Sequence, residues 1–570
     1  MTTARAEAHA EESGAETGGA ETEPMASVDP AAFAPALVQL ATGLAQHPVA
    51  ALRAATRLTG GLAVAGAESV ARVLGWEGAT TCTPPTDDRR FTDPAWDDNP
   101  WFLGHRQAYL ALSECARELD EVSGLEGPTA EKATFALGQV VDALAPTNFL
   151  WSNPAALRKA SETRGASVLA GVANFLDDVA ENGARPRQVD ASQFEVGGNL
   201  ACTPGKVVFR NDLMELIQYA PQTESVFEVP LLLSPPWINR FYIMDLAPGR
   251  SFVEWAVSHG HTTFAISYRN PDESMRKVTL DDYMLRGLAQ ALDVVAEITG
   301  SKHVNVAGLC VGGTLAVMLS AYLAQAGDER VRSVTLLNTL VDFSEPGALG
   351  AFTDAEAVAG VERRMAEHGF LDGREMATTF DSLRANDLIW NYVGSNWLMG
   401  QTPPAFDILA WNADPTRVPE ATHSGYLRAF YLENRLARGN LALAGRRLRL
   451  DDVTADTYVL AAEKDHITPW KSSYATTGLL AGQVRFVLSS AGHIAGIVNP
   501  PGPKRQHWTN EELPPEPEAW LADAVQHPGT WWEDWAGWIE ARAGSRRSPN
   551  DMGSTDHPPV ADAPGTYVHG

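Results

Sequence analysis

Cysteine is scarce in this sequence. The 570 residues hold only four cysteines, Cys82, Cys115, Cys202 and Cys310, and none of them forms a close C-x-x-C pair. This excludes a scaffold held together by many disulfides. Unpaired thiols persist in a reducing compartment, so the cytoplasm is the expected location. No spacing of histidine, cysteine or carboxylate residues suggests a metal site, and we expect neither a metal ion nor another cofactor.

Long apolar runs are also missing. No stretch of about 18 apolar residues occurs, which excludes an ordinary membrane-spanning helix. The N-terminal segment MTTARAEAHAEESGAETGGAETEP does not show the charged-then-apolar order of a secretory signal. Both observations agree with a cytoplasmic address.

Basic residues are fewer than acidic residues. Lysine and arginine together number 44, against 71 aspartates and glutamates, and the formal net charge is −27. Nucleic acid is therefore excluded as a partner, because lysine and arginine supply most of that affinity. Electrostatic docking on anionic lipid is disfavoured for the same reason. An anionic substrate would need a local basic pocket that works against the field of the whole protein.

The chain divides by composition and periodicity. Residues 1–30 are rich in Ala, Glu, Gly and Thr and predict a disordered acidic tail. Apolar residues recur at helical spacing in 31–200, which predicts a helical N-terminal domain. In 201–545, strand-like runs such as HVNVAGL and DTYVLAA alternate with helical stretches, which predicts an α/β catalytic domain with a largely parallel sheet. The alternation lapses in 343–450, which we interpret as a lid inserted over the C-terminal edge of the sheet. Residues 546–570 are dense in turn formers and predict a flexible tail.

The most informative segment surrounds Cys310. A short β-like run ends in Gly308-Leu309-Cys310-Val311-Gly312, and a helical stretch follows near Thr314. This is the G-x-S-x-G nucleophile elbow of the α/β-hydrolase fold with cysteine in place of serine. A helix that begins at the sulfur favours the thiolate, because the N-terminal end of a helix is positive. Cys310 is therefore the predicted nucleophile, and the alternative is a buried structural cysteine in a glycine turn.

The remaining members of a triad should follow in the order acid, then base. Asp465 comes just after the strand-like run TYVLAA, and His493 comes just after VRFVLS. Residues at such strand ends converge on one edge of the sheet. Glu463 is a rival for the acid, but it lies closer to the strand and is interpreted as a surface carboxylate. His466 is interpreted as a pocket-lining or structural residue.

The oxyanion hole needs two backbone N–H donors. The first is expected from Val311, the residue after the nucleophile. The second is expected from the loop in PLLLSPPWINRF, with Trp237 or Ile238 as the donor. Pro235 and Pro236 would stiffen that loop, because proline restricts φ. The alternative is a rigid surface turn.

Several longer motifs resemble those of one enzyme family. They run from about Phe91 to Gly544 and include FTDPAWDDNPWF, TPGKVVFRNDLMELIQY, PPWINRFYIMDL, GLCVGGT, RANDLIWNYV, DHITPW and GHIAGIVNPP. In these stretches the chain resembles class I polyhydroxyalkanoate synthases, which join 3-hydroxyacyl groups from coenzyme A (CoA) thioesters into a polyester and release CoA. The resemblance implies the roles already given to Cys310, Asp465 and His493. It also implies that Arg384 lies near the CoA path, and it suggests short-chain monomers such as 3-hydroxybutyryl-CoA.

The same resemblance implies the partners. These are the 3-hydroxyacyl-CoA substrate, the growing polyester chain and the surface of polymer granules, with a homodimer and granule-associated proteins as further expectations. One alternative is a thioesterase or polyester hydrolase of the same fold, which would release free acid. Another is a non-catalytic granule coat protein, which would not need the elbow, the aspartate and the histidine in order.

Overall fold

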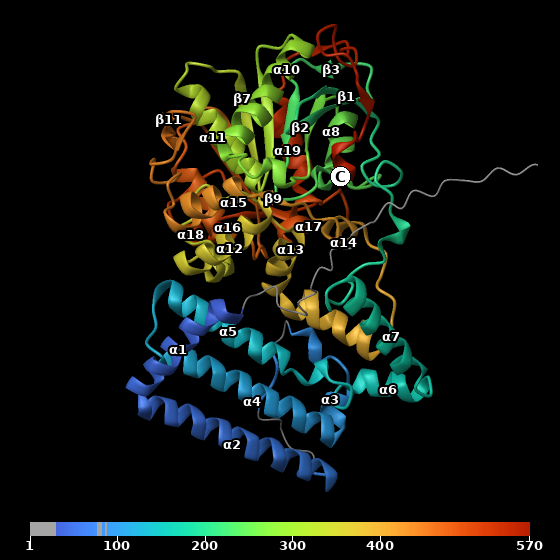
Figure 1. Cartoon of the computed structure of the whole chain (residues 1–570), viewed down its shortest axis with the longest axis vertical. Helices are drawn as coiled ribbons and strands as arrows, with labels where there is room; N and C mark the ends of the chain where they lie inside the picture. Colours follow the sequence, from blue (N-terminus) through green and yellow to red (C-terminus); the bar gives the residue numbers. More distant parts are fainter. Residues whose placement is uncertain (1–29, 77–81, 86–87) are drawn as a thin grey trace, which may run out of the picture.

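The computed structural model describes residues 30–76, 82–85 and 88–570. Apart from Pro30, the predicted tail 1–30 lies outside the described residues. The described part has a layer of helices at one end and a helix-covered sheet at the other, with the lid between them (Figure 1). Within these residues, no helix has both the length and the apolar character needed to cross a membrane.

The N-terminal part is helical, as predicted. Its helices are α1 (Pro30–Gln46), α2 (Pro48–Val73), α3 (Ala95–Asp98), α4 (Pro100–Val122), α5 (Gly127–Ala143), α6 (Pro154–Glu162) and α7 (Ala166–Glu181). Local sequence sets several of their starts. Asn99 caps α4 by accepting a hydrogen bond from the Trp101 N–H, and Pro100 occupies the first helical position. Helices α2 and α4 pack closely at Gly61, which has no Cβ. A Cβ there would lie only 2.8 Å from the Cβ of Ala111.

The second part is built on one mixed sheet, which confirms the predicted α/β class. Its spatial order in the described residues is β15-β14-β13-β12-β7-β6-β4-β5-β2-β1-β17. The parallel centre consists of β5 (Thr263–Tyr268), β4 (Leu231–Ser234), β6 (Val304–Leu309), β7 (Val331–Leu337), β12 (Asp456–Ala462) and β13 (Val484–Ser489). These strands coincide with runs predicted from the sequence. The antiparallel strands on either side are β1 (Gly205–Arg210), β2 (Met214–Tyr219), β14 (Gln506–Thr509), β15 (Val525–Pro528) and β17 (Ala561–Asp562).

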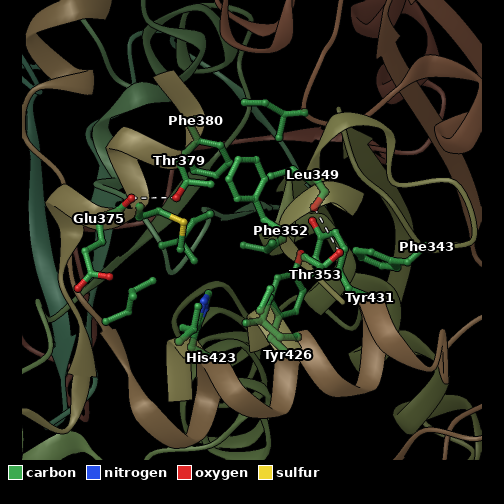
Figure 2. A pocket seen from close by; sticks show the side chains of 18 of the residues that line it. Phe343, Leu349, Phe352, Thr353, Glu375, Thr379, Phe380, His423, Tyr426 and Tyr431 are labelled. Carbon is green, nitrogen blue, oxygen red and sulfur yellow. Dashed lines mark hydrogen bonds between the residues drawn. The ribbon is translucent and has the colours of Figure 1, made fainter. Parts of the chain in front are cut away.

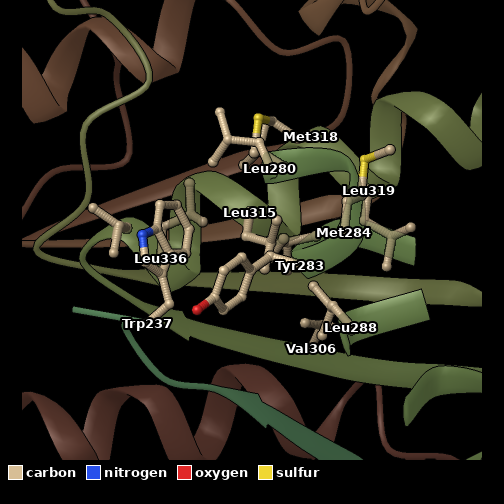
Figure 3. Packing of buried hydrophobic residues seen from close by; sticks show 14 of the residues in the cluster. Trp237, Leu280, Tyr283, Met284, Leu288, Val306, Leu315, Met318, Leu319 and Leu336 are labelled. Carbon is tan, nitrogen blue, oxygen red and sulfur yellow. The ribbon is translucent and has the colours of Figure 1, made fainter. Parts of the chain in front are cut away.

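Helices cover both faces of the sheet, as expected for parallel strands. On one face, α10 (Gln290–Thr299) and α11 (Val311–Ala324) bury leucines, valines and methionines; Figure 3 shows Leu315 and Met318 packed near Tyr283. On the other face lie α8 (Phe252–Ser258) and α19 (Trp531–Glu540). Trp531 and Trp535 are buried there, and Trp538 packs beside them, so these tryptophans share the face of α19 that meets the sheet.

The main elements of the lid lie between β7 and residue 433. They are η7 (Gly347–Phe352), α12 (Ala355–His368), β8 (Phe370–Leu371), α13 (Gly373–Ser382), η8 (Asn386–Trp390), η9 (Val393–Leu398), α14 (Asp407–Asn412), β9 (Val418–Pro419), α15 (Glu420–Tyr426) and η10 (Leu427–Leu432). The N-terminal helices contact this lid directly. Lys132 donates a hydrogen bond to Asp354 at 2.6 Å, and the indole N–H of Trp397 donates to Asp178 at 2.8 Å.

The structure corrects the expectation of a flexible C-terminal tail over 546–570. Strand β16 (Arg546–Arg547) pairs with β3 (Val226–Phe227), and β17 pairs with the edge strand β1. The fully buried carboxylate of Glu215 accepts backbone N–H bonds from Thr566 at 2.9 Å and Tyr567 at 3.0 Å. The turn-forming composition was a poor guide here, because these long-range hydrogen bonds hold the segment against the sheet.

Deleting residues 561–570 is expected to lower the free energy of unfolding by at least about 2 kcal/mol. Glu215 would lose two N–H donors that the deleted segment contributes, and hydrogen bonds to charged groups are worth about this much. Urea denaturation of the full chain and of the shortened chain measures the difference. The control is Asp562→Asn, which removes only a surface ion pair with Lys206 and should change little. Equal stability of the two chains would restore the interpretation as a loose tail.

Candidate active site

Cys310 lies at a tight turn between β6 and α11. Its backbone has φ 52° and ψ −123°, a conformation that residues other than glycine rarely adopt. Glycine is required on both sides because the chain is crowded. A Cβ at Gly312 would lie 2.2 Å from the carbonyl oxygen of Ser234, and one at Gly308 would lie 2.4 Å from the Cα of Gly313. The turn therefore presents the Cys310 side chain at the carboxyl edge of the sheet, at the start of a helix.

His493 and Asp465 reach the same edge from two neighbouring strands. Asp465 follows β12, and His493 opens the short helix α17 (His493–Ile497) after β13. The two side chains are buried, and the Nδ1 of His493 lies 2.7 Å from the Oδ2 of Asp465. Cys310 interacts electrostatically with the His493 side chain and helps to raise its pKa. The structure thus brings together the nucleophile, base and acid that the sequence predicts.

Asp465 is held as a carboxylate by its surroundings. Its Oδ1 accepts the backbone N–H groups of Ile467 at 2.8 Å and Thr468 at 2.9 Å, and its Oδ2 accepts the hydroxyl of Thr468 at 2.7 Å. Burial by itself raises the pKa of Asp465, but the attraction of His493 and these hydrogen bonds outweigh burial, and the net pKa is lowered.

The pKa of His493 depends on its pairing with Asp465. Burial lowers the pKa of His493, but the adjacent Asp465 carboxylate and the contact with Cys310 outweigh it, and the pKa is raised to about 10. A raised pKa makes the imidazole a stronger base. It therefore favours transfer of the Cys310 proton to His493.

Two residues that sequence reasoning missed complete this cluster. The Thr468 hydroxyl lies 3.2 Å from the Nδ1 of His493 and 3.3 Å from the carbonyl oxygen of Asn338. The side-chain amide of Asn338, just after β7, donates to the carbonyl oxygen of His493. The one signal for Thr468 was its place three residues after Asp465, where a hydroxyl can return to the carboxylate. Nothing in the sequence pointed to Asn338.

A cavity of about 220 Å³ opens onto the thiol. Cys310, Val311 and Ile238 line it on the sheet side, and lid residues form most of the remaining wall. Figure 2 shows Phe343, Phe352 and other lid side chains around the space. The side chain of Trp237 is instead buried in the core, where its ring packs against those of Tyr283 and Tyr426. Of the two expected donors in that loop, Ile238 is therefore the one beside the cavity.

Two tyrosines form a neutral wall near the sulfur. Tyr426 and Tyr431 line the cavity, and they interact electrostatically with each other and with Cys310. Burial raises the pKa of both hydroxyls, so neither carries a charge at neutral pH.

Arg384 and His466 lie to one side of this cavity. Arg384 is half-exposed, forms an ion pair with Asp387, and lines a separate polar cleft of about 940 Å³ together with Arg89 and Lys464. His466 is within electrostatic reach of Arg384, and burial lowers its pKa to about 4. The cleft lies between the N-terminal helices and the lid, and its lining combines these basic residues with the carboxylates of Asp88, Asp93 and Asp387.

No group of three or more histidine, cysteine, aspartate or glutamate side chains within the described ranges is arranged to hold a metal ion. The expectation of no metal and no cofactor stays a prediction.

A sheet with a parallel centre and helices on both faces, a cysteine at a strand–helix elbow, and an aspartate and a histidine after later strands are the features of an α/β-hydrolase-type protein. Family comparisons agree. Residues 247–500 match the family described as "alpha/beta hydrolase fold", and residues 87–256 match "Poly-beta-hydroxybutyrate polymerase (PhaC) N-terminus".

Curated relatives extend this similarity over nearly the whole chain. The poly(3-hydroxyalkanoate) polymerase of Methylorubrum extorquens is 44% identical over 93% of this chain and 89% of its own length. The polymerase subunit PhaC of Cupriavidus necator is 43% identical over 86% of this chain and 85% of its own length. Poly(3-hydroxyalkanoate) polymerase 2 of Ectopseudomonas oleovorans is 44% identical over 86% of this chain and 88% of its own length. The chain belongs to the poly(3-hydroxyalkanoate) polymerase family.

Proposed function

We propose that this enzyme polymerises 3-hydroxyacyl groups, delivered as CoA thioesters, into a polyester through a covalent intermediate on Cys310. The observation that carries the proposal is that Asp465 contacts His493, that His493 interacts with Cys310, and that Cys310 lines a mainly apolar cavity. The names of the relatives support the polyester product.

In the loading step, the Nε2 of His493 takes the thiol proton of Cys310, and the sulfur attacks the thioester carbonyl carbon. The tetrahedral intermediate collapses and breaks the carbon–sulfur bond to CoA. The leaving thiolate takes the proton from His493, and CoA departs. Asp465 holds the Nδ1 proton of His493 and stabilises the imidazolium while it carries both protons.

In the elongation step, His493 removes the proton from the 3-hydroxyl group of an incoming 3-hydroxyacyl-CoA, whose oxygen attacks the acyl carbonyl carbon held on Cys310. The new ester bond forms as the carbon–sulfur bond to Cys310 breaks, and the Cys310 thiolate regains a proton from His493. The lengthened CoA thioester then acylates Cys310 again by the loading step, which releases CoA. Each cycle thus adds one repeat and releases one CoA. The exchange of one thioester for another is nearly balanced in free energy, which suits a sulfur nucleophile.

The negative oxygen of each intermediate is assigned to the backbone N–H groups of Val311 and Ile238. Val311 is the first residue of α11, so its N–H has no partner within that helix. Both residues line the cavity beside Cys310.

The polar cleft at Arg384 is the proposed path of the CoA moiety. Arg89, Arg384 and Lys464 offer positive charge to its phosphates in an otherwise acidic protein. The lid covers the apolar cavity and keeps water from the acyl-enzyme. A preference for short-chain monomers, and chemistry without metal or cofactor, are part of the proposal.

A homodimer, attachment to the surface of cytoplasmic polymer granules and contacts with granule-associated proteins complete the proposal. Exposed apolar side chains on α7, among them Leu169, Val172 and Leu176, support an apolar contact by the N-terminal helices.

Product analysis tests the function directly. Incubation of the full chain with 3-hydroxybutyryl-CoA is expected to release CoA in step with high-molecular-weight polyester and without stoichiometric 3-hydroxybutyrate. CoA is followed by thiol titration, and polymer by size-exclusion chromatography. Release of CoA with free acid and no polymer would instead identify a thioesterase, the alternative of the same fold. A graded series of acyl lengths measures the monomer preference in the same assay.

A further inference from the structure

A lid histidine points into the cavity without a partner. His423 lies on α15 and lines the cavity that opens onto Cys310. Its side chain is buried, with the residue 6% exposed, and its Nδ1 has no hydrogen-bond partner. In Figure 2 a ring nitrogen of His423 is directed towards the centre of the cavity. A buried polar atom without a partner is unfavourable, so the position needs an explanation.

Neighbouring polar side chains of the same cavity are already satisfied. The hydroxyl of Thr379 donates to the carbonyl oxygen of Glu375 at 3.0 Å, and that of Thr314 donates to Leu340 at 2.8 Å. His423 differs from these residues because neither of its ring nitrogens forms a hydrogen bond in the described part of the chain, and the nitrogen that Figure 2 shows facing the space is available to a bound molecule.

His423 lies close to one helical turn from a residue that interacts with Cys310. Tyr426 interacts electrostatically with Cys310, and His423 precedes it by three residues on α15. Three residues are close to one helical turn, so the two side chains share a face and are offset by about 4.5 Å along the axis. Tyr431 lies further along the chain than Tyr426 and also interacts with Cys310. His423 precedes Tyr426, so it lies on the opposite side of Tyr426 from Tyr431.

The surroundings restrict the chemistry of the imidazole. Burial lowers the pKa of His423 to about 4, so the ring is neutral at physiological pH. A neutral imidazole has one N–H donor and one acceptor nitrogen. The wall around it is apolar, with Leu371, Met376 and Phe380 among its residues. This combination suits a ligand with apolar groups and evenly spaced acceptors but no charge.

A polyester of 3-hydroxyacyl units has that character. Each repeat carries one carbonyl acceptor between apolar carbons, and its interior has no donor. We propose that His423 donates a hydrogen bond to a carbonyl oxygen of a repeat beyond the one attached to Cys310, and so holds the growing chain in the cavity. This inference rests on the proposed acyl-enzyme at Cys310.

The test compares two acyl donors, the CoA thioester of a single 3-hydroxybutyrate and that of its linear trimer. His423→Phe keeps a ring of similar size but removes both nitrogens. We expect it to raise KM for the trimer thioester about tenfold, the effect of one hydrogen bond, and KM for the monomer less than about twofold. His423→Asn restores a donor and should return the trimer KM to within about threefold of wild type.

Controls separate this role from packing. His368→Phe makes the same change at an exposed lid position, and neither KM should move. His423→Leu is a second apolar variant in case the phenylalanine variant does not fold, and thermal unfolding of each variant monitors the fold. Equal effects on monomer and trimer, or no effect on either, would overturn the inference. A wild-type enzyme that releases no CoA from either thioester would overturn the proposed function instead.

Discussion

Cys310→Ala is expected to abolish CoA release from 3-hydroxybutyryl-CoA, with a loss of at least about 10⁴-fold in kcat. The substitution removes the atom that forms the covalent intermediate, and no neighbouring group can replace it. The fold should persist, because alanine fits the space of cysteine and the backbone N–H of Cys310 still donates to the carbonyl oxygen of Leu337 at 2.9 Å.

The measurement is CoA release by thiol titration, with circular dichroism to monitor the fold. Cys82→Ala is the matched control, since only backbone atoms of Cys82 make its hydrogen bonds with Gln107 and full activity is expected. Mass spectrometry of the wild-type enzyme after brief exposure to substrate should find the acyl group on the peptide that contains Cys310. Substantial turnover by the alanine variant would remove Cys310 from the mechanism.

Asp465→Asn is expected to reduce kcat by about 10³- to 10⁴-fold with a much smaller change in KM. The amide keeps the shape of the carboxylate but no longer accepts the Nδ1 proton of His493 as an anion, so the imidazole loses both its orientation and its basicity. Because Asp465 is the main cause of the raised pKa of His493, the pH dependence of kcat should also shift.

The control for this substitution is Glu463→Gln, which changes an exposed carboxylate two residues earlier on the chain. Near-normal turnover is expected for it. The reverse pattern, with a slow Glu463 variant and a normal Asp465 variant, would assign the acid to the rival that the sequence also offers.

The pairing of His493 with Asp465 predicts that the difference in stability between the wild type and Asp465→Asn depends on pH. The pKa of His493 is raised from 6.5 to about 10, so its stabilising effect is complete below about pH 6.5 and is lost as the pH rises towards 10. The pKa of Asp465 is lowered, so its effect is present above about pH 4 and is lost at more acidic pH. The excess stability of the wild type over Asp465→Asn, measured by urea denaturation, should therefore be largest near pH 5–6 and shrink by pH 10. A difference that is constant with pH would contradict this pairing.

Part of the fold was readable because its signals are local. The central strands are short runs of β-branched and apolar residues, and burial on both faces makes such runs conspicuous. The elbow is equally local, because the crowding at Gly308 and Gly312 is imposed by adjacent residues and the next strand. The edges of the sheet were not readable in the same way. Strand β2 contains polar residues such as Glu215 and Gln218, which are buried only because the C-terminal segment covers them.

The sequence by itself determined the α/β class, and it predicted the position of the nucleophile and the chain order of nucleophile, acid and base. Each of these depends on residues that are close along the chain or on a topology that allows few solutions. Only the tertiary structure decided which groups surround them. Thr468 and Asn338 support the pair of His493 and Asp465, and His423 faces the cavity, because strands and lid segments far apart in the sequence meet at one edge of the sheet. A contact between distant segments leaves no periodicity or spacing in the sequence, and so no local pattern could have revealed it.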